Sequence, residues 1–359
     1  MENDLARLAR DLVRIDSRSS LSNIAVAERI LPELDGFEVE RLDYTDPRGV
    51  AKCVLVAHRG EPGGLALSGH MDTVPDTGWT DDPWSGRIAD GVLHGLGSVD
   101  MKGPVAACIL AAREVERATL LITTDEETTK QGARLIAEHS QLVRKAAPRG
   151  IVVAEPTMLA PVRGHRASIM FTATAEGVQA HSSTGQGVNA NWALIPFLVE
   201  VRALFERLRS DPSLQDTAYD PPFSDFNLVV DNHGTAPNVT VPRATAVVKF
   251  RYSAKVDPAP VVAAMRAAAR AHGLHLHEAA EGRPPELPED HPLVREAMRA
   301  TNAAPRTVAF GTDASELQQL APCLVLGPGG IGVAHTPHEH VALADLDRAR
   351  GIFRRLLDA

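Results

Sequence analysis

The segment LALSGHMD, residues 65–72, decides how the rest of the sequence is interpreted. Its short apolar run, which follows two glycines, predicts a buried β-strand that ends at His70. Strand ends of α/β sheets are where loops converge on a crevice and sites form. Because residues i and i+2 of a strand point the same way, Asp72 could orient a His70 that binds metal. A surface histidine beside a capping aspartate explains the same residues equally well.

Four apolar runs end in residues of metal-ligand type, and a fifth such residue opens the helix expected after a glycine-rich loop. In chain order these residues are His70, Asp100, the acids at 125–127, Glu155 and His335. If the strands are parallel, their ends lie on one edge of the sheet, where the side chains can converge. Two histidines with several carboxylates suit Zn²⁺. Taken singly, an N-cap explains Asp100 and a solvated acidic turn explains 125–127.

The segment HTPHEH, residues 335–340, holds three histidines in six positions. This density suggests a metal, although the zinc-binding pattern HExxH is absent. His335 follows an apolar run and a glycine loop, which gives it a place at a strand end. For His338 and His340, the N-terminus of a helix rich in histidine and glutamate is the simpler interpretation.

The order of the expected elements indicates two domains. Helices alternate with apolar strands early in the chain, which is typical of an α/β domain with a largely parallel sheet. The helices expected there cover 2–15, 22–34 and 100–117. Residues 166–279 instead follow the order β-α-β-β-α-β of the ferredoxin-like motif. We therefore expect a catalytic domain formed by 1–164 and 282–359, with a domain inserted at 165–281.

Length and charge exclude several classes of protein. The chain has 359 residues, which fits two domains, and a formal net charge of −9. That acidic balance argues against nucleic acid as a partner, because phosphate binding needs a basic face. No apolar run reaches the roughly 18 residues of a membrane span, and no apolar signal-peptide stretch follows the early acids. The scattered cysteines are expected to be buried reduced thiols. We therefore expect a cytoplasmic protein without membrane contact.

Together, these motifs resemble the M20 metallopeptidase family over essentially the whole chain and in the family's order. The segments VAEPT (153–157), FGTDAS (310–315) and LGPG (326–329) are most similar to the family's deacetylases of acetylornithine and acetylcitrulline. The resemblance implies an α/β zinc-hydrolase catalytic domain, whose mixed sheet is flanked by helices. It also implies an inserted ferredoxin-like α+β domain that serves as lid and dimerisation domain.

The same resemblance implies two bound Zn²⁺ ions, for which Co²⁺ or Mn²⁺ could substitute. One ion would be held by His70 and Glu155 and the other by Glu127 and His335. Asp100 would bridge the two ions. This assignment uses one residue from each of the motifs above.

Three residues are implied in catalysis. Asp72 would orient the histidine that precedes it, and Glu126 would be the general base for a zinc-bound hydroxide. Glu126 would then return the proton to the leaving amine. His181, in the segment GVQAHSS (177–183), would reach an active site, commonly that of the second subunit of a homodimer. There it would help to stabilise the oxyanion.

Four further positions match segments that contact substrate in the family: Asn238, Arg251, Asp313 and Gly329. Arg251 would hold the substrate's carboxylate, but it could also be an ordinary surface residue. Asn238 also suits a turn. Asp313 could recognise a distal amine of the substrate, or it could cap a helix at 313–320.

The activity implied is hydrolysis of the amide bond of an N-acyl amino acid, most directly deacetylation of N-acetyl-L-ornithine in arginine biosynthesis. Alternatives within the fold are deacetylation of acetylcitrulline, desuccinylation of succinyl-diaminopimelate, hydrolysis of a carrier-protein adduct in lysine biosynthesis, and dipeptide cleavage. An inactive dimeric zinc-binding homologue is the alternative of another class, and the presence of both glutamates and every ligand argues against it. Pro104, His338 and His340 depart from the family pattern without touching a ligand.

Overall fold

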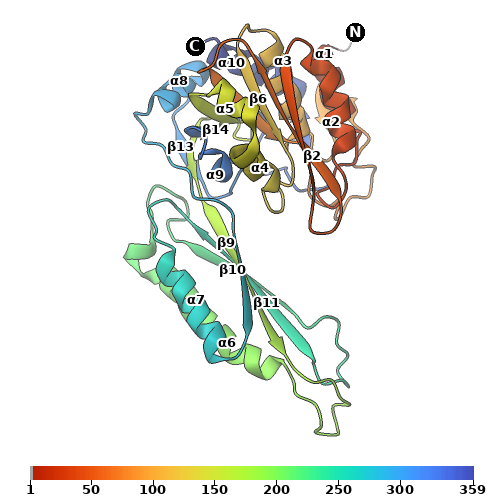
Figure 1. Ribbon diagram of the computed structural model, residues 1–359, viewed down its shortest axis with the longest axis vertical. Helices are drawn as coiled ribbons and strands as arrows, with labels where there is room; N and C mark the ends of the chain where they lie inside the picture. The colour runs from red at the N-terminus through yellow and green to blue at the C-terminus, as the bar shows by residue number, and fades with distance from the viewer. Residues whose placement is uncertain (1–2) are drawn as a thin grey trace. The chain divides into compact units, whose positions relative to one another are not determined.

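The computed structural model describes residues 3–359, which divide into two compact units (Figure 1). The larger unit contains the described residues up to Gly164 together with Pro285–Thr307 and Thr312–Ala359. The smaller unit contains His165–Pro284 and Val308–Gly311. Each unit has a hydrophobic core of its own, as a domain does.

Within the described residues, the larger unit is built on a mixed eight-stranded sheet. In sheet order its strands are β1 (Glu38–Thr45), β2 (Ala51–Arg59), β6 (Ala118–Thr123), β3 (Leu65–His70), β7 (Gly150–Val153), β14 (Cys323–Val325), β8 (Val162–His165) and β13 (Arg306–Val308). The neighbours β6, β3, β7 and β14 run parallel. The pairings of β1 with β2, β2 with β6 and β8 with β14 are antiparallel. Every residue of β3, β6 and β7 is buried, as fits central strands covered on both faces.

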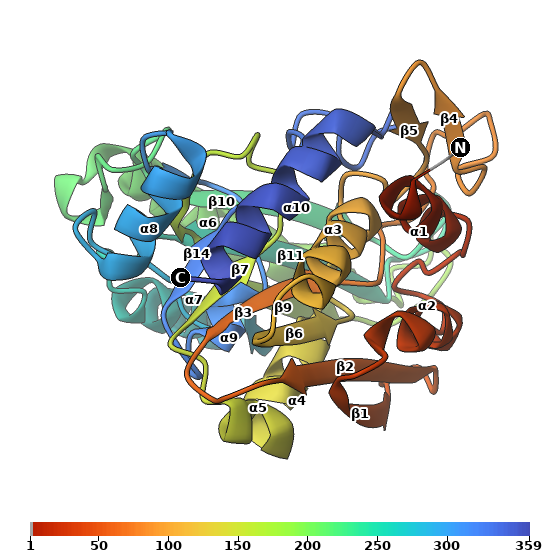
Figure 2. The same ribbon diagram turned by 90° about the horizontal axis from the view of Figure 1, so that it is seen from above.

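Helices cover both faces of this sheet (Figure 2). They are α1 (Asp4–Val13), α2 (Ile24–Ile30), η1 (Leu31–Leu34), α3 (Lys102–Arg113), α4 (Gln131–His139), α5 (Gln141–Ala146), α8 (Pro292–Thr301), α9 (Ala314–Leu317) and α10 (Leu343–Leu357). On one face α1 and α10 pack against α3, and both α3 and α10 contact β3. On the other face α4 contacts β2, β6 and α9, and α5 contacts β2. The short strands β4 (Arg87–Ala89), β5 (Val92–His94) and β15 (His340–Ala342) form a separate antiparallel sheet.

This architecture confirms the α/β fold class with a mixed sheet flanked by helices. A largely parallel sheet was expected, but only the centre is parallel, because β1 and β2 form an antiparallel hairpin at one edge. The helix expected at 100–117 begins at Lys102 and ends at Arg113. Asp100 therefore lies in the preceding loop, and its interpretation as an N-cap is wrong, since Met101 holds that position.

The smaller unit follows the order strand, helix, strand, strand, helix, strand. Its elements are β9 (Ala167–Glu176), α6 (Asn191–Ser210), η2 (Pro212–Leu214), β10 (Asp225–Asp231), β11 (Arg243–Tyr252), α7 (Ala259–Ala271) and β12 (His275–Ala280). The sheet order is β10-β11-β9-β12 with antiparallel pairings, which is the ferredoxin-like arrangement. Phe171, Phe197 and Phe250 are buried in its core, where α6 packs on β9 and β11.

The cysteines of the chain do not form a reactive or cross-linked set. Cys53, Cys108 and Cys323 are buried free thiols. Burial raises the pKa of Cys53 to about 11, so its reactive thiolate is disfavoured at neutral pH. Among residues 3–359, no helix combines the length and the apolar character needed to cross a membrane.

Candidate metal centre

The candidate site lies at the carboxyl-terminal edge of the parallel strands of the larger unit. His70 is the last residue of β3, and Glu126 and Glu127 follow β6. Glu155 is the second residue after the end of β7, and His335 belongs to the loop that follows β14. Because these strands are parallel neighbours, their ends meet on one edge of the sheet. Side chains that are distant in the sequence are thereby brought together.

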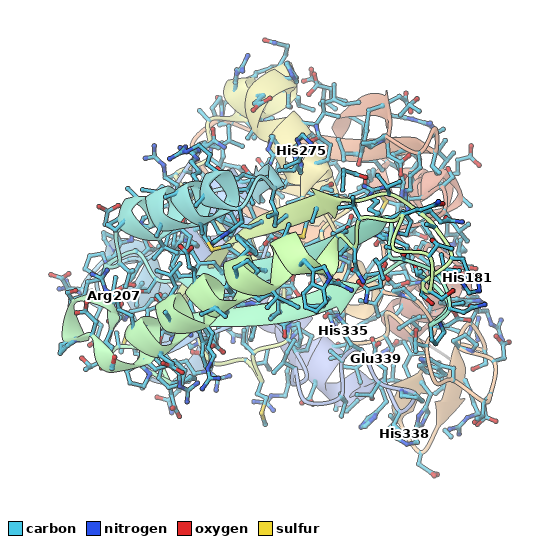
Figure 3. The ribbon with its side chains drawn as sticks, turned by 90° about the horizontal axis from the view of Figure 1, so that it is seen from below. His181, Arg207, His275, His335, His338 and Glu339 are labelled. Carbon is cyan, nitrogen blue, oxygen red and sulfur yellow. The ribbon has the colours of Figure 1, made fainter. Side chains whose placement is uncertain are left out.

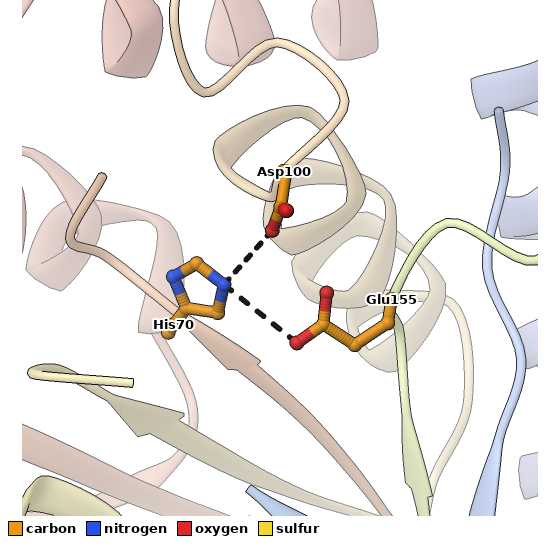
Figure 4. Close-up of side chains that lie close together, drawn as sticks. All are labelled: His70, Asp100 and Glu155. Atoms are coloured by element: carbon orange, nitrogen blue, oxygen red, sulfur yellow. Dashed lines mark hydrogen bonds and ion pairs between the residues drawn. The ribbon is translucent and has the colours of Figure 1, made fainter. Parts of the chain in front are cut away.

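The first cluster consists of His70, Asp100 and Glu155, all buried (Figure 4). His70 Nε2 lies 3.1 Å from Asp100 Oδ1 and 3.7 Å from Glu155 Oε1. On the other side of the ring, Nδ1 donates a hydrogen bond of 2.9 Å to the main-chain carbonyl oxygen of Asp72. In a neutral ring, Nε2 then aims a lone pair at two carboxylates. This arrangement needs a proton or a cation, and the donor set suits a divalent metal.

The second cluster consists of Asp100, Glu127 and His335. His335 Nε2 lies 3.0 Å from Glu127 Oε1 and 3.2 Å from Asp100 Oδ2. Asp100 therefore faces His70 with one carboxylate oxygen and His335 with the other. A carboxylate shared in this way is suited to bridge a pair of metal ions. Backbone φ at His335 is +60°, a conformation that non-glycine residues adopt mainly where surrounding structure imposes it.

Burial and close charges shift the pKa values of these groups. Burial, followed by the charge of Asp100, raises the pKa of Glu127 to about 7 and raises the pKa of Glu155 well above its ordinary value. Hydrogen bonds with Asp100 and Glu127 raise the pKa of His335 to about 11. Burial lowers the pKa of His70, but its carboxylate neighbours outweigh burial and the pKa is raised. Without a metal the cluster holds extra protons, which a divalent cation would displace on binding.

Asp72 supports the site through its main chain and through its carboxylate. Its carbonyl oxygen accepts from His70 Nδ1 at 2.9 Å, while its Oδ1 lies 3.5 Å from the same nitrogen. The carboxylate accepts from Ser19 Oγ at 2.7 Å. It also accepts from the main-chain N–H groups of Glu126 and Glu127, at 3.2 and 3.3 Å. Asp72 thus ties the imidazole of one motif to the acidic turn of another.

The three consecutive acids after β6 have different environments. Asp125 forms a buried ion pair of 2.9 Å with Lys52, and Tyr44 Oη donates to it at 2.6 Å. Glu126 is 8% exposed and forms an ion pair with Lys130. The solvated-turn alternative is therefore wrong for these acids, because their side chains are buried and paired. Only the second and third acids are left to serve the metal cluster.

Asp313 and Gly329 also belong to the larger unit. Asp313 is 1% exposed and accepts a hydrogen bond from Thr123 Oγ1. Burial, followed by the charge of Glu126, raises the pKa of Asp313 to about 7. Asp313 holds the N-cap position of α9, but its side chain makes no capping hydrogen bond. Thr312 Oγ1, one residue earlier, accepts from Ala314 N at 3.1 Å. The helix-cap alternative for Asp313 is therefore correct in position, whereas its carboxylate does not act as the cap.

Gly329 occupies a position that other residues would strain. Its φ is +68°, and a Cβ there would lie 2.3 Å from a side-chain carbon of Val99. Its carbonyl oxygen accepts from Met158 N at 2.6 Å. The glycine therefore lets this loop approach the residue that precedes Asp100.

His181, Asn238 and Arg251 all belong to the smaller unit. His181 is exposed and its Nδ1 pairs with Ser183 Oγ at 2.8 Å. Its segment lies beside that of Asn238, whose carbonyl oxygen accepts from Ser182 N at 3.0 Å. Arg251 stands near the far end of β11, opposite Asp225 and Ser168. The unit thus brings His181 and Asn238 together and keeps Arg251 away from both.

Sequence reasoning missed Ser19, Lys130 and Glu339, each of which contacts a residue of the site. Glu339 lies inside HTPHEH, four residues after His335, but no local pattern of the sequence marks it as buried against the loop of Asp100. His338 is exposed and lies farther out than Glu339 and His335 (Figure 3). His340 begins β15, and its ring is tilted by 36° to that of His94, with ring centroids 5.8 Å apart. The helix-terminus interpretation of these two histidines is wrong, because α10 begins only at Leu343.

Comparison with known proteins identifies the family. Residues 66–359 match the model of "Peptidase family M20/M25/M40". An acetylornithine deacetylase of Proteus mirabilis (strain HI4320) is 32% identical over 370 residues, which cover 96% of this chain and 92% of that protein. The dipeptidase Dug1p of Saccharomyces cerevisiae has the same fold, with a TM-score of 0.79 at 14% identity over 98% of this chain and 95% of that one.

A further solved structure shares the fold. It is the YXEP protein of Bacillus subtilis, described as a dinuclear metal-binding peptidase of the M20 family, with a TM-score of 0.64 at 15% identity. It covers 98% of this chain and 96% of that one. With the ligand-type residues gathered at one sheet edge, these matches establish that the chain is a metal-dependent amidohydrolase of peptidase family M20/M25/M40.

Proposed function

We propose that this protein deacylates an N-acyl amino acid and that its substrate is N-acetyl-L-ornithine, which would place it in arginine biosynthesis. The observation that carries the proposal is the pair of ligand clusters that share Asp100, with Glu126 beside Glu127. The substrate is supported by the acetylornithine deacetylases that match over nearly the whole chain. The buried free thiols suit a reducing cytoplasm, where we propose that it acts.

We propose that two Zn²⁺ ions occupy the clusters, with Co²⁺ or Mn²⁺ as substitutes. His70, Asp100 and Glu155 would hold one ion, and Asp100, Glu127 and His335 the other. Imidazole and carboxylate are both accepted ligands of zinc. A bound pair of this kind lowers the pKa of water and polarises a carbonyl group.

Glu126 is the proposed proton carrier of the reaction. Its carboxylate would take a proton from the attacking water and hand it to the nitrogen of the leaving amine. Lys130 pairs with this carboxylate, and Asp72 accepts from the main-chain N–H of Glu126 at 3.2 Å. These contacts fix where the carboxylate stands before substrate arrives.

The proposed substrate contacts come from both units of the chain. Arg251 would hold the α-carboxylate, and Asp313 would recognise the distal amine of ornithine. Asn238 would contact the substrate and His181 would stabilise the oxyanion. The close packing of Gly329 beside Val99 would shape the pocket wall.

One chain cannot supply all of these contacts from its smaller unit. Arg251 and Arg243 stand at opposite ends of β11, and His181 pairs with Val239, just before that strand begins. At about 3.3 Å per residue, the strand alone separates the two groups by on the order of 25 Å, beyond the reach of a small acyl amino acid. We propose that the partner subunit's His181 and the partner subunit's Asn238 complete each site, with Arg251 from the chain that holds the metals.

The smaller unit offers a surface for such a homodimer. β10 is an edge of its sheet, and Leu228, Val229 and Val230 are 44%, 54% and 46% exposed. Trp192 and Val199 of α6 are 74% and 63% exposed. An open strand edge bearing apolar side chains is a template for pairing with another chain. Two copies of β10 related by a twofold axis would continue the sheet, so we propose that this unit dimerises there.

The substrate assignment is tested with a panel of acetylornithine, acetylcitrulline, succinyl-diaminopimelate and dipeptides at fixed metal content. We expect kcat/KM to be highest for acetylornithine, because a buried Asp313 should favour a cationic side chain. A higher kcat/KM for any other compound of the panel would change the assigned substrate but would leave amide hydrolysis as the reaction. Absence of amidase activity on the whole panel would favour the inactive zinc-binding homologue.

Metal dependence is tested by removal and by substitution. EDTA should abolish activity, and Zn²⁺ or Co²⁺ should restore it. Asp100→Ala should reduce binding of both ions, because Asp100 faces both histidines. Glu155→Ala should weaken one ion only. Metal content measured by mass spectrometry distinguishes these outcomes, and equal losses in the two variants would contradict a shared Asp100.

Glu126→Ala separates proton transfer from metal binding. We expect kcat to fall by roughly 10²–10⁴-fold, the usual contribution of a general base, while metal content stays at the wild-type level. Glu138→Ala removes an exposed carboxylate of α4 and serves as the control. Near wild-type turnover in Glu126→Ala would show that another group carries the proton.

The shared site is tested by mixing two inactive proteins. His181→Ala and Glu126→Ala homodimers should each lack activity. In a mixed dimer, one site combines an intact Glu126 with the partner subunit's intact His181. Co-expression should therefore restore about a quarter of wild-type activity, since half of the dimers are mixed and each has one complete site. If His181 serves its own chain, no mixture will recover activity.

A further inference from the structure

Glu339 is a charged residue in an unusual position. It is 1% exposed, and its Oε1 accepts hydrogen bonds from the main-chain N–H groups of Gly97, Val99 and Asp100. The distances are 2.9, 3.1 and 3.1 Å. Main-chain N–H groups that converge on one oxygen form an anion-binding concavity, and here a side chain of the protein fills it.

These three N–H groups belong to the loop that presents Asp100. Other hydrogen bonds of the loop use different atoms: Ser98 N donates to Gly95 O, and Lys102 N donates to Gly97 O. The loop is itself buried, so loss of the Glu339 oxygen would leave its donors without a partner. The shape of this loop therefore depends on a residue more than two hundred positions away in the sequence.

Glu339 also connects the two segments that form the second cluster. It follows His335 by four residues, and Glu339 N donates to Thr336 O at 3.1 Å in the turn between them. Its own carbonyl oxygen accepts from Gly95 N at 3.1 Å. The same residue thus joins the His335 segment to both ends of the loop that carries Asp100. It is not a member of either ligand-type cluster found among the described residues.

We propose that Glu339 is a positioning residue for the metal pair, which fixes the main chain of Asp100 so that each carboxylate oxygen faces one histidine. The inference rests on the proposed function, because it assumes that the two clusters bind metal. The required orientation is narrow: Oδ1 lies 3.1 Å from His70 and Oδ2 lies 3.2 Å from His335. Rotation of the main chain at Asp100 would move one oxygen away from its histidine.

The proposed role depends on where an oxygen stands rather than on charge, and two substitutions separate these possibilities. Glu339→Gln keeps an acceptor oxygen at the same distance from the backbone and removes the charge. Among the described residues, Glu339 Oε2 has no hydrogen-bond partner, so the new amide nitrogen replaces no existing contact. Glu339→Asp keeps the charge and withdraws the oxygens by one methylene group.

The experiment titrates the metal-free full-length proteins with Co²⁺ and follows the visible spectrum of the bound ion. We expect Glu339→Asp and Glu339→Ala to bind Co²⁺ about 10–100-fold more weakly, as is usual when a residue supporting a ligand is lost. Their kcat should fall while KM stays near the wild-type value. Glu339→Gln should stay within about threefold of wild type in Co²⁺ affinity.

Glu40→Ala is the matched control. Glu40 also accepts main-chain N–H groups, those of Gln141 and Leu142, at the start of α5. The Glu40→Ala substitution should lower the melting temperature of the metal-free protein without changing Co²⁺ affinity. If Glu339→Ala does not fold, Glu339→Asp and Glu339→Gln still decide the question.

Two results would overturn the inference: unchanged Co²⁺ affinity in Glu339→Asp, or Co²⁺ binding by Glu339→Gln that is as weak as that of Glu339→Ala. The second result would assign Glu339 an electrostatic role instead. If the wild-type protein itself binds no pair of Co²⁺ ions, the proposed function fails. If it binds the pair and the Glu339→Asp protein does so equally well, only the positioning role fails.

Discussion

Asp100 divides its carboxylate between two histidines, with one oxygen 3.1 Å from His70 and the other 3.2 Å from His335. Glu127 and Glu155 crowd the same buried space, where charges that are not compensated are costly. Burial and the charge of Asp100 raise the pKa values of both glutamates, so the cluster is held together by protons or by cations. The rest of the larger unit can be understood as the framework that keeps these groups close.

That framework has an inner part and an outer part. The inner part is the set of parallel strands β6, β3, β7 and β14, whose ends deliver ligand-type residues to one edge. The outer part consists of buried polar contacts that hold the loops: Asp72 binds the turn after β6, and Glu339 binds the loop of Asp100. Residues of this outer kind commonly tune metal affinity without touching the ion.

The sequence was sufficient for the fold class and for the grouping of the ligand-type residues. His70, Glu127 and Glu155 could be found because each follows an apolar run, and strand ends in a parallel sheet share an edge. Glu339 and Lys130 could not, since their importance comes from contacts that local patterns do not encode. Lys130 follows Glu126 by four residues, but a turn rather than a helix brings them together. The N-cap interpretation of Asp100 failed because Met101 takes that position. Asp313 does hold the N-cap position of α9, but its carboxylate makes no capping hydrogen bond.

The central claim is that this sheet edge seats a pair of metal ions around Asp100. The most direct measurement is anomalous X-ray diffraction at the zinc absorption edge from crystals of the zinc-loaded protein. We predict two anomalous peaks, one among His70, Asp100 and Glu155 and one among Asp100, Glu127 and His335. A single peak, or peaks away from Asp100, would contradict the account.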